Sequence, residues 1–306
     1  MGTPPGVELK FLIGDERAKA HPEVRSLFSH KGVTQDNLGK ILRAHPQVKW
    51  LHSWTTGFDN IEGVPELINS DIVLTNAKDC FSESLGEFIP LGMLYFSKKL
   101  PLFLKQQTEH KWSNTPVEML QGKTLVIVGY GDIGMHVAKR AKLGFEMKVV
   151  GVKRSPAAAT EEAKKYVDHI VGLDGLEQAM REGDYVCSIL PGIKDNIHFF
   201  NEERLGWLKE SAVFMSIGRG VVVKEEALIP LLENNNIRGA VLDVYEKEPL
   251  SAESKLWDLK NILMYPHNAD LTYDYQELTY KMFLKNLDLY MAGKPLTGVA
   301  DKKRGY

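Results

Sequence analysis

The sequence is poor in cysteine and contains no long apolar stretch. Cys80 and Cys187 are the only cysteines among 306 residues. Two cysteines are too few for a disulfide framework or a cysteine zinc site, so we expect a reducing compartment. No apolar run approaches the length of about 18 residues that indicates a transmembrane helix. We therefore expect none.

Charge of one sign is also not concentrated anywhere. The chain has 38 lysines and arginines against 40 aspartates and glutamates, which gives no reason to expect nucleic acid or an anionic membrane as partner. The first residues, MGTPPGVELK, lack the basic region and apolar stretch of an export signal, and Gly6 stands where a myristoylation signal needs Ser or Thr. We expect a cytoplasmic protein.

Short apolar segments alternate with helical patterns along the whole chain. A length of 306 residues with 43% hydrophobic content is enough for two hydrophobic cores. The alternation predicts an α/β protein with two doubly wound parallel-sheet domains. The expected strands are VELKFLI (7–13), VKWLHSW (48–54), IVLTN (72–76), LVIVG (125–129), MKVVGV (147–152), YVCSIL (185–190), AVFMSI (212–217), IRGAVLDV (237–244) and ILMYP (262–266).

Two helical patterns suggest how the domains are connected. Residues 82–103 predict one long helix, bent at Pro90, with its apolar stripe at Leu85, Phe88, Ile89, Gly92, Met93 and Phe96. Residues 275–291 predict a helix that returns the chain to the first domain. We therefore expect one domain from 1–95 and 272–306, an inserted domain from 96–271, and hinges near residues 95 and 272.

The segment LVIVGYGDIG (125–134) carries the strongest local signal. An apolar strand opens onto Gly129, Gly131 and Gly134, and a helical pattern follows. This is the pattern of a dinucleotide-binding βα turn, in which the three glycines allow a tight turn, close approach of a pyrophosphate and close helix packing. The amide groups at the start of the helix would meet the phosphates.

The residues after the next strand bear on the choice of cofactor. Lys153, Arg154 and Ser155 stand where an NAD-selective site usually has an acidic residue for the adenosine ribose. Two cations and a hydroxyl favour a 2′-phosphate, so we predict that NADP(H) is preferred and NAD(H) possible, with Arg154 as the main contact. The alternative is a solvated basic turn without selectivity.

Three further residues follow strands at the edge where open α/β sheets bind ligands. Arg219 follows VFMSIG and could hold a carboxylate through paired donors. Glu248, in DVYEKEPL, is one of three carboxylates in six residues and, taken alone, reads as a loop acid. His267 follows MYP and could serve as an acid/base because its ordinary pKa lies near neutrality, although most single histidines do no chemistry.

Taken together, these motifs resemble those of a known family. GYGDIG, SIGRG, DVYEKEPL and YPHNADLT occur in the order and approximate spacing of the D-isomer-specific 2-hydroxyacid dehydrogenases. The loop HSWTTGFD, the segment TNAKDCFSESLGEF and the terminal GVADKKRGY add to the resemblance. Its short length and basic cofactor turn resemble the family's glyoxylate and hydroxypyruvate reductases. The resemblance implies a Rossmann cofactor domain inserted into a flavodoxin-like substrate domain, and NAD(P)H-dependent reduction of a small 2-keto acid to the D-2-hydroxy acid.

The family's site residues carry over to matching positions. Arg219 would bind and polarise the substrate, His267 would exchange the proton and Glu248 would support the imidazolium. In the first domain, Thr56 and Gly57 resemble the turn whose backbone amides bind the substrate carboxylate. Trp54 would narrow the pocket for the substituent on the keto carbon, although it could equally be core packing. The expected cofactor contacts are Gly129, Tyr130, Gly131, Asp132, Ile133, Gly134, Lys153, Arg154, Ser155, Leu190, Pro191, Ile217 and Asp243, the last of which could instead be a structural cap. No metal site is expected.

Some features leave alternatives open. Asp79 and Asp270 stand where the family usually has small residues, which puts substrate choice in doubt. D-Lactate dehydrogenase is the enzymatic rival, a formate dehydrogenase is disfavoured by Glu248, and an NAD(H)-responsive corepressor-like protein is the rival of another class. The resemblance implies a homodimer through the cofactor domain, and the segment with Trp112 could reach the partner, unless Trp112 is simply a surface residue.

Overall fold

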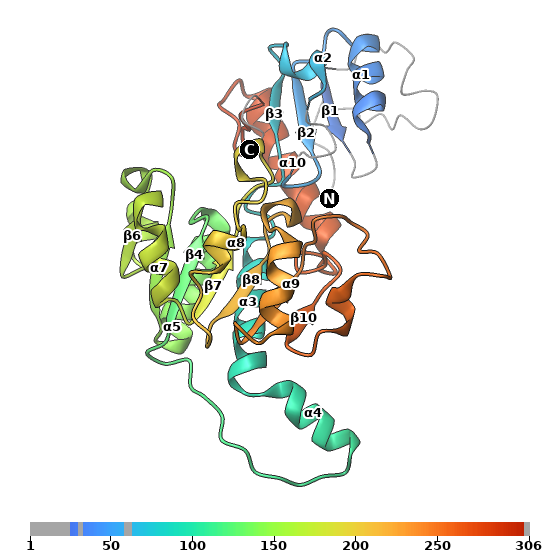
Figure 1. Ribbon diagram of the computed structural model, residues 1–306. Coiled ribbons are helices and arrows are strands. Elements are labelled where there is room, and N and C mark those ends of the chain that lie inside the picture. The colour runs from blue at the N-terminus through green and yellow to red at the C-terminus, as the bar shows by residue number, and fades with distance from the viewer. Residues whose placement is uncertain (1–24, 30–32, 58–62, 303–306) are drawn as a thin grey trace. The chain divides into compact units, whose positions relative to one another are not determined.

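The computed structural model describes residues 25–29, 33–57 and 63–302 (Figure 1). The chain forms two compact units, Met1–Phe81 with Tyr273–Tyr306, and Ser82–Thr272. The second unit is therefore inserted into the first. The chain crosses between them after Phe81 instead of near residue 95, because residues 82–97 pack within the larger unit. The expected strand at 7–13 lies outside the described residues, as do residues 58–59 of HSWTTGFD and 303–306 of the terminal motif.

The larger unit is built on a parallel sheet in the order β10-β9-β8-β7-β4-β5-β6. Its strands are β4 (Thr124–Val128), β5 (Lys148–Val152), β6 (His169–Val171), β7 (Tyr185–Ser188), β8 (Val213–Ser216), β9 (Gly239–Leu242) and β10 (Ile262–Met264). The chain starts at β4, runs outward to β6, and then returns to β7 on the other side of β4. This is the doubly wound order of a Rossmann fold, which binds its ligand at the carboxyl ends of the strands where the order reverses.

Helices complete the larger unit. They are α3 (Ser82–Ser97), α4 (Leu100–Thr108), α5 (Asp132–Phe145), α6 (Glu161–Lys164), α7 (Leu176–Glu182), α8 (Glu202–Leu205) and α9 (Glu225–Glu233). The central strands read as continuous apolar runs because both faces are buried, and Val126, Val186 and Phe214 have no exposed surface. The sequence did not predict β6, whose residues HIV alternate little and are only partly buried.

The long helix predicted over 82–103 is two helices. Its apolar stripe is buried as expected, and α3 continues through Pro90. The chain breaks further on, where Lys99 adopts a left-handed conformation with φ 52° and α4 begins with Pro101 in its first turn. Proline is favoured there because the first amides of a helix have no partner within it. The prediction of a single helix was wrong for this reason.

The smaller unit contains a parallel sheet in the order β1-β2-β3. Its described elements are β1 (Ser26–Ser29), α1 (Gln35–Ala44), β2 (Trp50–Ser53), α2 (Pro65–Ile68), β3 (Val73–Thr75) and α10 (Tyr275–Met291). The predicted helix at 275–291 is confirmed, and its Phe283 stacks on Trp50 with ring centroids 5.4 Å apart. Across the described residues, no helix is long and apolar enough to cross a membrane.

Two buried polar side chains, Thr75 and His52, lie next to Trp50. The Thr75 hydroxyl accepts the indole N–H of Trp50 at 2.8 Å and lies 2.7 Å from Nδ1 of His52. It can donate its own proton to that nitrogen only if Nδ1 is unprotonated. Burial lowers the pKa of His52 to about 4, because a charged imidazolium loses its hydration there.

We expect acid to destabilise the smaller unit through His52. The folded state binds a proton less readily than the unfolded chain, so stability is present above pH 6.5 and is lost as the pH falls toward 4. The loss between pH 7 and pH 5 should be about 2 kcal/mol. Urea unfolding at both pH values should show it, and His52→Gln should reduce the difference. An equal pH dependence in both proteins would contradict this account.

Candidate active site

The glycine turn lies between β4 and α5 at the switch point of the sheet. Gly129 adopts φ 97°, and a Cβ there would lie 2.6 Å from the carbonyl oxygen of Ile189. A Cβ on Gly131 would meet nothing within 4 Å, whereas one on Gly134 would lie 3.1 to 3.3 Å from the turn and strand. The three glycines thus provide, in order, a tight turn, open space at the start of α5 and close helix packing. These residues fit a dinucleotide pyrophosphate.

Three further residues of this turn lie in two different environments. Asp132 and Ile133 begin α5, where amide groups point out of the helix end. Tyr130 is buried instead: its amide donates to the Val152 carbonyl, and its hydroxyl donates to the Ala163 carbonyl at 2.7 Å. Its ring occupies the space above Gly151. The Tyr130 side chain therefore packs inside the unit, and its role as a cofactor contact stays a prediction.

The other expected cofactor residues gather at the same edge. Lys153, Arg154 and Ser155 directly follow β5, with Arg154 and Ser155 exposed. Leu190 and Pro191, after β7, are half-buried. Ile217, after β8, is buried, and its amide donates to the Ser188 carbonyl. All of these positions lie at the carboxyl ends of strands.

A close backbone contact fixes the position of Arg219 after β8. A Cβ on Gly220 would lie 1.7 Å from the carbonyl oxygen of Tyr245, so only glycine allows this approach. The stem of Arg219 packs against Gly192, and Nη1 donates to the Gly218 carbonyl at 3.0 Å. The RG pair therefore joins the end of β8 to the segment after β9.

Glu248 and His267 are hydrogen-bonded. His267 Nδ1 lies 2.7 Å from Oε2 of Glu248, while Oε1 accepts the Tyr245 amide at 3.0 Å. The acid among the three candidates is thus Glu248, since Glu246 contacts His198 and the Glu225 amide instead. The pairing leaves Nε2 of His267 as the nitrogen for a substrate proton.

Asp243 holds the loop that carries His267. Its carboxylate accepts the amides of Asn268 at 2.8 Å and Ala269 at 3.1 Å, and its carbonyl accepts the His267 amide at 2.7 Å. His267 itself has φ 54°, a left-handed conformation that costs about 1 kcal/mol outside glycine. These three hydrogen bonds hold the loop, and with it the left-handed backbone of His267, in one conformation. They favour the structural-cap interpretation of Asp243 that the sequence left open.

Electrostatics favour the charged form of the pair. The hydrogen bond and charge of Glu248 raise the pKa of His267, against burial and the charge of Arg219. Burial acts to raise the pKa of Glu248, but the bonds from His267 and the Tyr245 amide, with the charges of His267 and Arg219, leave it below its usual value. Burial raises the pKa of Asp243 despite its amide donors. His267 is thus protonated further into the neutral range.

The predicted substrate loop belongs to the smaller unit. The Thr55 hydroxyl donates to the Gly57 carbonyl at 2.6 Å, and Asn76 donates to the Thr56 carbonyl at 2.6 Å, so the turn is well braced. Trp54, Thr56 and Gly57 are half-buried. Nearby, Asp79 has φ 71°, a left-handed conformation that aspartate tolerates better than most residues do.

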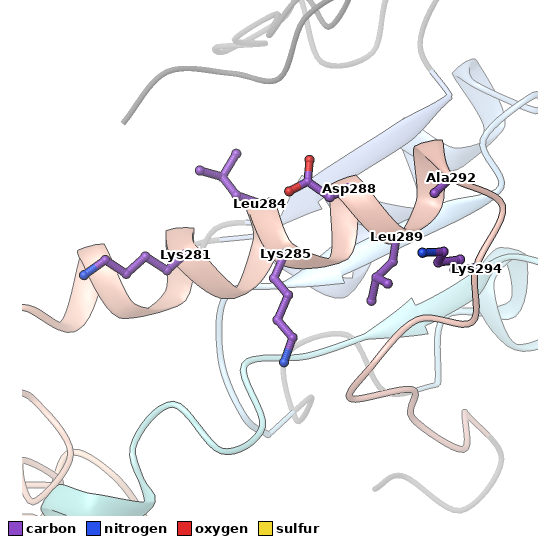
Figure 2. Close-up of a pocket in the computed structure, with 7 residues that line it drawn as sticks. All are labelled: Lys281, Leu284, Lys285, Asp288, Leu289, Ala292 and Lys294. Carbon is purple, nitrogen blue, oxygen red and sulfur yellow. The ribbon is translucent and has the colours of Figure 1, made fainter.

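A surface cavity of about 490 Å³ lies elsewhere in the smaller unit, along α10 (Figure 2). Its described lining includes none of the expected site residues. The lining consists of Lys281, Leu284, Lys285, Asp288, Leu289, Ala292 and Lys294. Lys281 is engaged by Glu277 at 2.6 Å.

Comparison with known proteins identifies the family of the chain. A family model described as "D-isomer specific 2-hydroxyacid dehydrogenase, NAD binding domain" matches residues 91–269. The chain belongs to the D-isomer-specific 2-hydroxyacid dehydrogenase family. Within this family, it is 32% identical to a probable 2-ketogluconate reductase of Dictyostelium discoideum, over 81% of this chain and 74% of that protein. It is 31% identical to glyoxylate/hydroxypyruvate reductase B of Escherichia coli, over 85% and 79%.

Solved structures of family members superpose on the chain. An NADPH-dependent glyoxylate/hydroxypyruvate reductase of Sinorhizobium meliloti, in complex with NADP and sulfate, matches with a TM-score of 0.82 and 25% identity, over 95% of this chain and 88% of that one. A family member of Xanthobacter autotrophicus, in complex with NADPH, matches with a TM-score of 0.80 and 27% identity, over 93% and 86%. The family resemblance seen in the motifs is confirmed.

Proposed function

We propose that this protein reduces a small 2-keto acid to the D-2-hydroxy acid with a nicotinamide cofactor. The observation that carries the proposal is the hydrogen bond between His267 and Glu248, placed beside the charge of Arg219 and in the same unit as the glycine turn. This arrangement offers a proton donor, its supporting carboxylate and a cation for a substrate carboxylate. The relatives named as glyoxylate, hydroxypyruvate and 2-ketogluconate reductases support it.

Each residue has a distinct role in the proposed reaction. Arg219 binds the substrate carboxylate and polarises the neighbouring carbonyl. The cofactor, when bound, supplies the hydride. Protonated His267 gives its Nε2 proton to the carbonyl oxygen as negative charge develops there, and Glu248 stabilises the imidazolium before transfer. Backbone amides at Thr56 and Gly57 would hold the carboxylate from the smaller unit, with Trp54 limiting the size of the substituent.

The test is a cofactor-by-substrate assay. Loss of 340 nm absorbance should be measured with NADPH and NADH against glyoxylate, hydroxypyruvate, pyruvate and phenylpyruvate. Turnover of glyoxylate and hydroxypyruvate supports the proposal. Preference for pyruvate would make the protein a D-lactate dehydrogenase, while tight cofactor binding without turnover of any 2-keto acid would overturn the reductase assignment and favour the corepressor-like alternative.

We propose that NADP(H) is preferred over NAD(H). Arg154 is exposed directly after β5, at the position expected to meet the adenosine ribose, with Lys153 and Ser155 beside it. Arg154→Asp should raise KM for NADPH by about 10- to 100-fold, because a phosphate-binding cation becomes a repelling carboxylate, and should affect NADH much less. Arg181→Asp, at an exposed position of α7, is the matched control. Equal effects on both cofactors would contradict the preference.

We propose that the protein is a cytoplasmic homodimer. The segment from α4 to Met119 exposes Leu102, Leu104 and Trp112, the last with 95% of its surface, and clustered exposed apolar side chains are typical of interfaces. Light scattering at micromolar concentration should give the dimer mass. Trp112→Ser with Leu104→Ser should shift the protein to a monomer, whereas a monomeric wild type would contradict the proposal.

The crossings at 81–82 and 272–273 would serve as hinges between a substrate domain and a cofactor domain.

A further inference from the structure

The first turn of α3 contacts two separate parts of the proposed site. The Ser84 hydroxyl donates to the Ala269 carbonyl at 2.6 Å, and the Ser82 hydroxyl donates to the carboxylate of Asp132. Ala269 lies two residues after His267, and Asp132 is the first residue of α5, beside the glycine turn. All of these residues belong to the larger unit. One turn of helix is thus tied to both the histidine loop and the cofactor helix.

The contact from Ser84 completes the support of the histidine loop. Asp243 holds this loop through the amides of Asn268 and Ala269, so the amide of Ala269 is bound from the end of β9 and its carbonyl from α3. The two bonds grip one residue from different elements. Since His267 holds a left-handed backbone conformation, a displacement of Ala269 would turn the imidazole relative to Glu248.

The contact from Ser82 fixes the same turn at its other end. Ser82 is buried, and its partner Asp132 places a carboxylate at the helix end where a pyrophosphate would bind. A carboxylate that pointed toward the phosphates would repel them. The hydrogen bond from the Ser82 hydroxyl holds the Asp132 carboxylate in one orientation. Further along, Glu83 pairs with Arg140 and His136 of α5, so the two helices are linked over more than one turn.

We propose that Ser84 is a positioning residue for the acid/base His267, with Ser82 anchoring the same helical turn to the cofactor helix. Neither serine touches the substrate in this account, which rests on the proposed function for the role of His267. The charged groups that act on the imidazole are Glu248, Arg219 and Asp243. Ser84 acts on none of them directly, but it sets where the imidazole lies among them.

The test compares Ser84→Thr with Ser84→Val, two side chains of equal shape that differ in the hydroxyl. Ser84→Val should lower kcat by about three- to tenfold, the worth of one hydrogen bond, with KM for the cofactor little changed. Ser84→Thr should stay close to wild type. Ser97→Ala, in the last turn of the same helix, should leave the activity unchanged. Equal kcat for the Thr and Val variants would overturn the proposal.

A second readout does not need turnover. NMR titration of the His267 imidazole, assigned with His267→Asn, should show a lower pKa in Ser84→Val than in Ser84→Thr, because the bond to Glu248 is weakened. Ser82→Ala should shift it in the same direction, and the double variant should shift it by less than the sum. If wild type reduces no 2-keto acid, the proposed function fails, yet this titration still decides the positioning role: identical titrations would end it.

Discussion

Replacement of His267 by asparagine should lower kcat/KM for reduction by about 10²- to 10⁴-fold, the usual contribution of a positioned proton donor. Asparagine is chosen because it tolerates the left-handed backbone of this position, φ 54°. The affinity for the cofactor should change little. Initial rates at 340 nm and cofactor titration by fluorescence together measure both effects.

The pH profile provides a second measurement on the same variant. Because Glu248 raises the pKa of His267, reductive kcat/KM in wild type should be constant at low pH and should fall as the pH rises through this raised pKa. The variant should lose this decline. His198→Asn is a matched control, since His198 also pairs with a glutamate, Glu246, and also has a positive φ of 51°. Retention of activity within about threefold in His267→Asn would refute the acid/base role.

Replacement of Gly220 by alanine should destabilise the larger unit by roughly 3 kcal/mol or more. The new Cβ would lie 1.7 Å from the carbonyl oxygen and 1.9 Å from the carbonyl carbon of Tyr245. Neither atom can move by a rotamer change, so the backbone must shift. That shift would move Arg219, which precedes Gly220, relative to the segment that carries Glu248, and we expect reductive activity to fall with stability.

Gly144→Ala is the control for this prediction. Gly144 lies in α5, and a Cβ there would meet nothing within 4 Å. Alanine should therefore stabilise the helix by about 0.5 to 1 kcal/mol. Urea unfolding followed by circular dichroism compares the two variants. If Gly220→Ala were as stable as wild type, the close approach between residues 220 and 245 would not exist in solution.

The sequence predicted most strands of the larger unit because parallel strands are apolar throughout, and the glycine turn because each glycine has a separate steric reason. Two strands were missed: β1, whose residues SLFS carry little apolar pattern, and β6 at the far edge of its sheet. The break at Lys99 was also missed. Periodicity describes helix faces and does not reveal a left-handed residue between two helices.

The residues of the candidate site that do the chemistry could be predicted from the sequence, but the contacts that position them could not. Motif order pointed to Arg219, Glu248 and His267, yet only the fold shows which of three nearby carboxylates meets the histidine. A motif position also says nothing about packing, and only the fold shows that the Tyr130 ring fills the space above Gly151. Ser84 was not found, since a hydroxyl contacting a carbonyl 185 residues away leaves no local signal.

The hydrogen bond between Ser84 and Ala269 also joins the first and last parts of the inserted unit. These residues lie near its two limits, Ser82 and Thr272, and their side-chain and backbone atoms are 2.6 Å apart. The first and last residues of the inserted unit therefore lie close together, as the termini of domains often do. Residues 82–272 could therefore be excised as one piece. On the other side of the junction, Phe81 and Tyr275 stack with ring centroids 4.4 Å apart, so a short linker could join the two ends that remain.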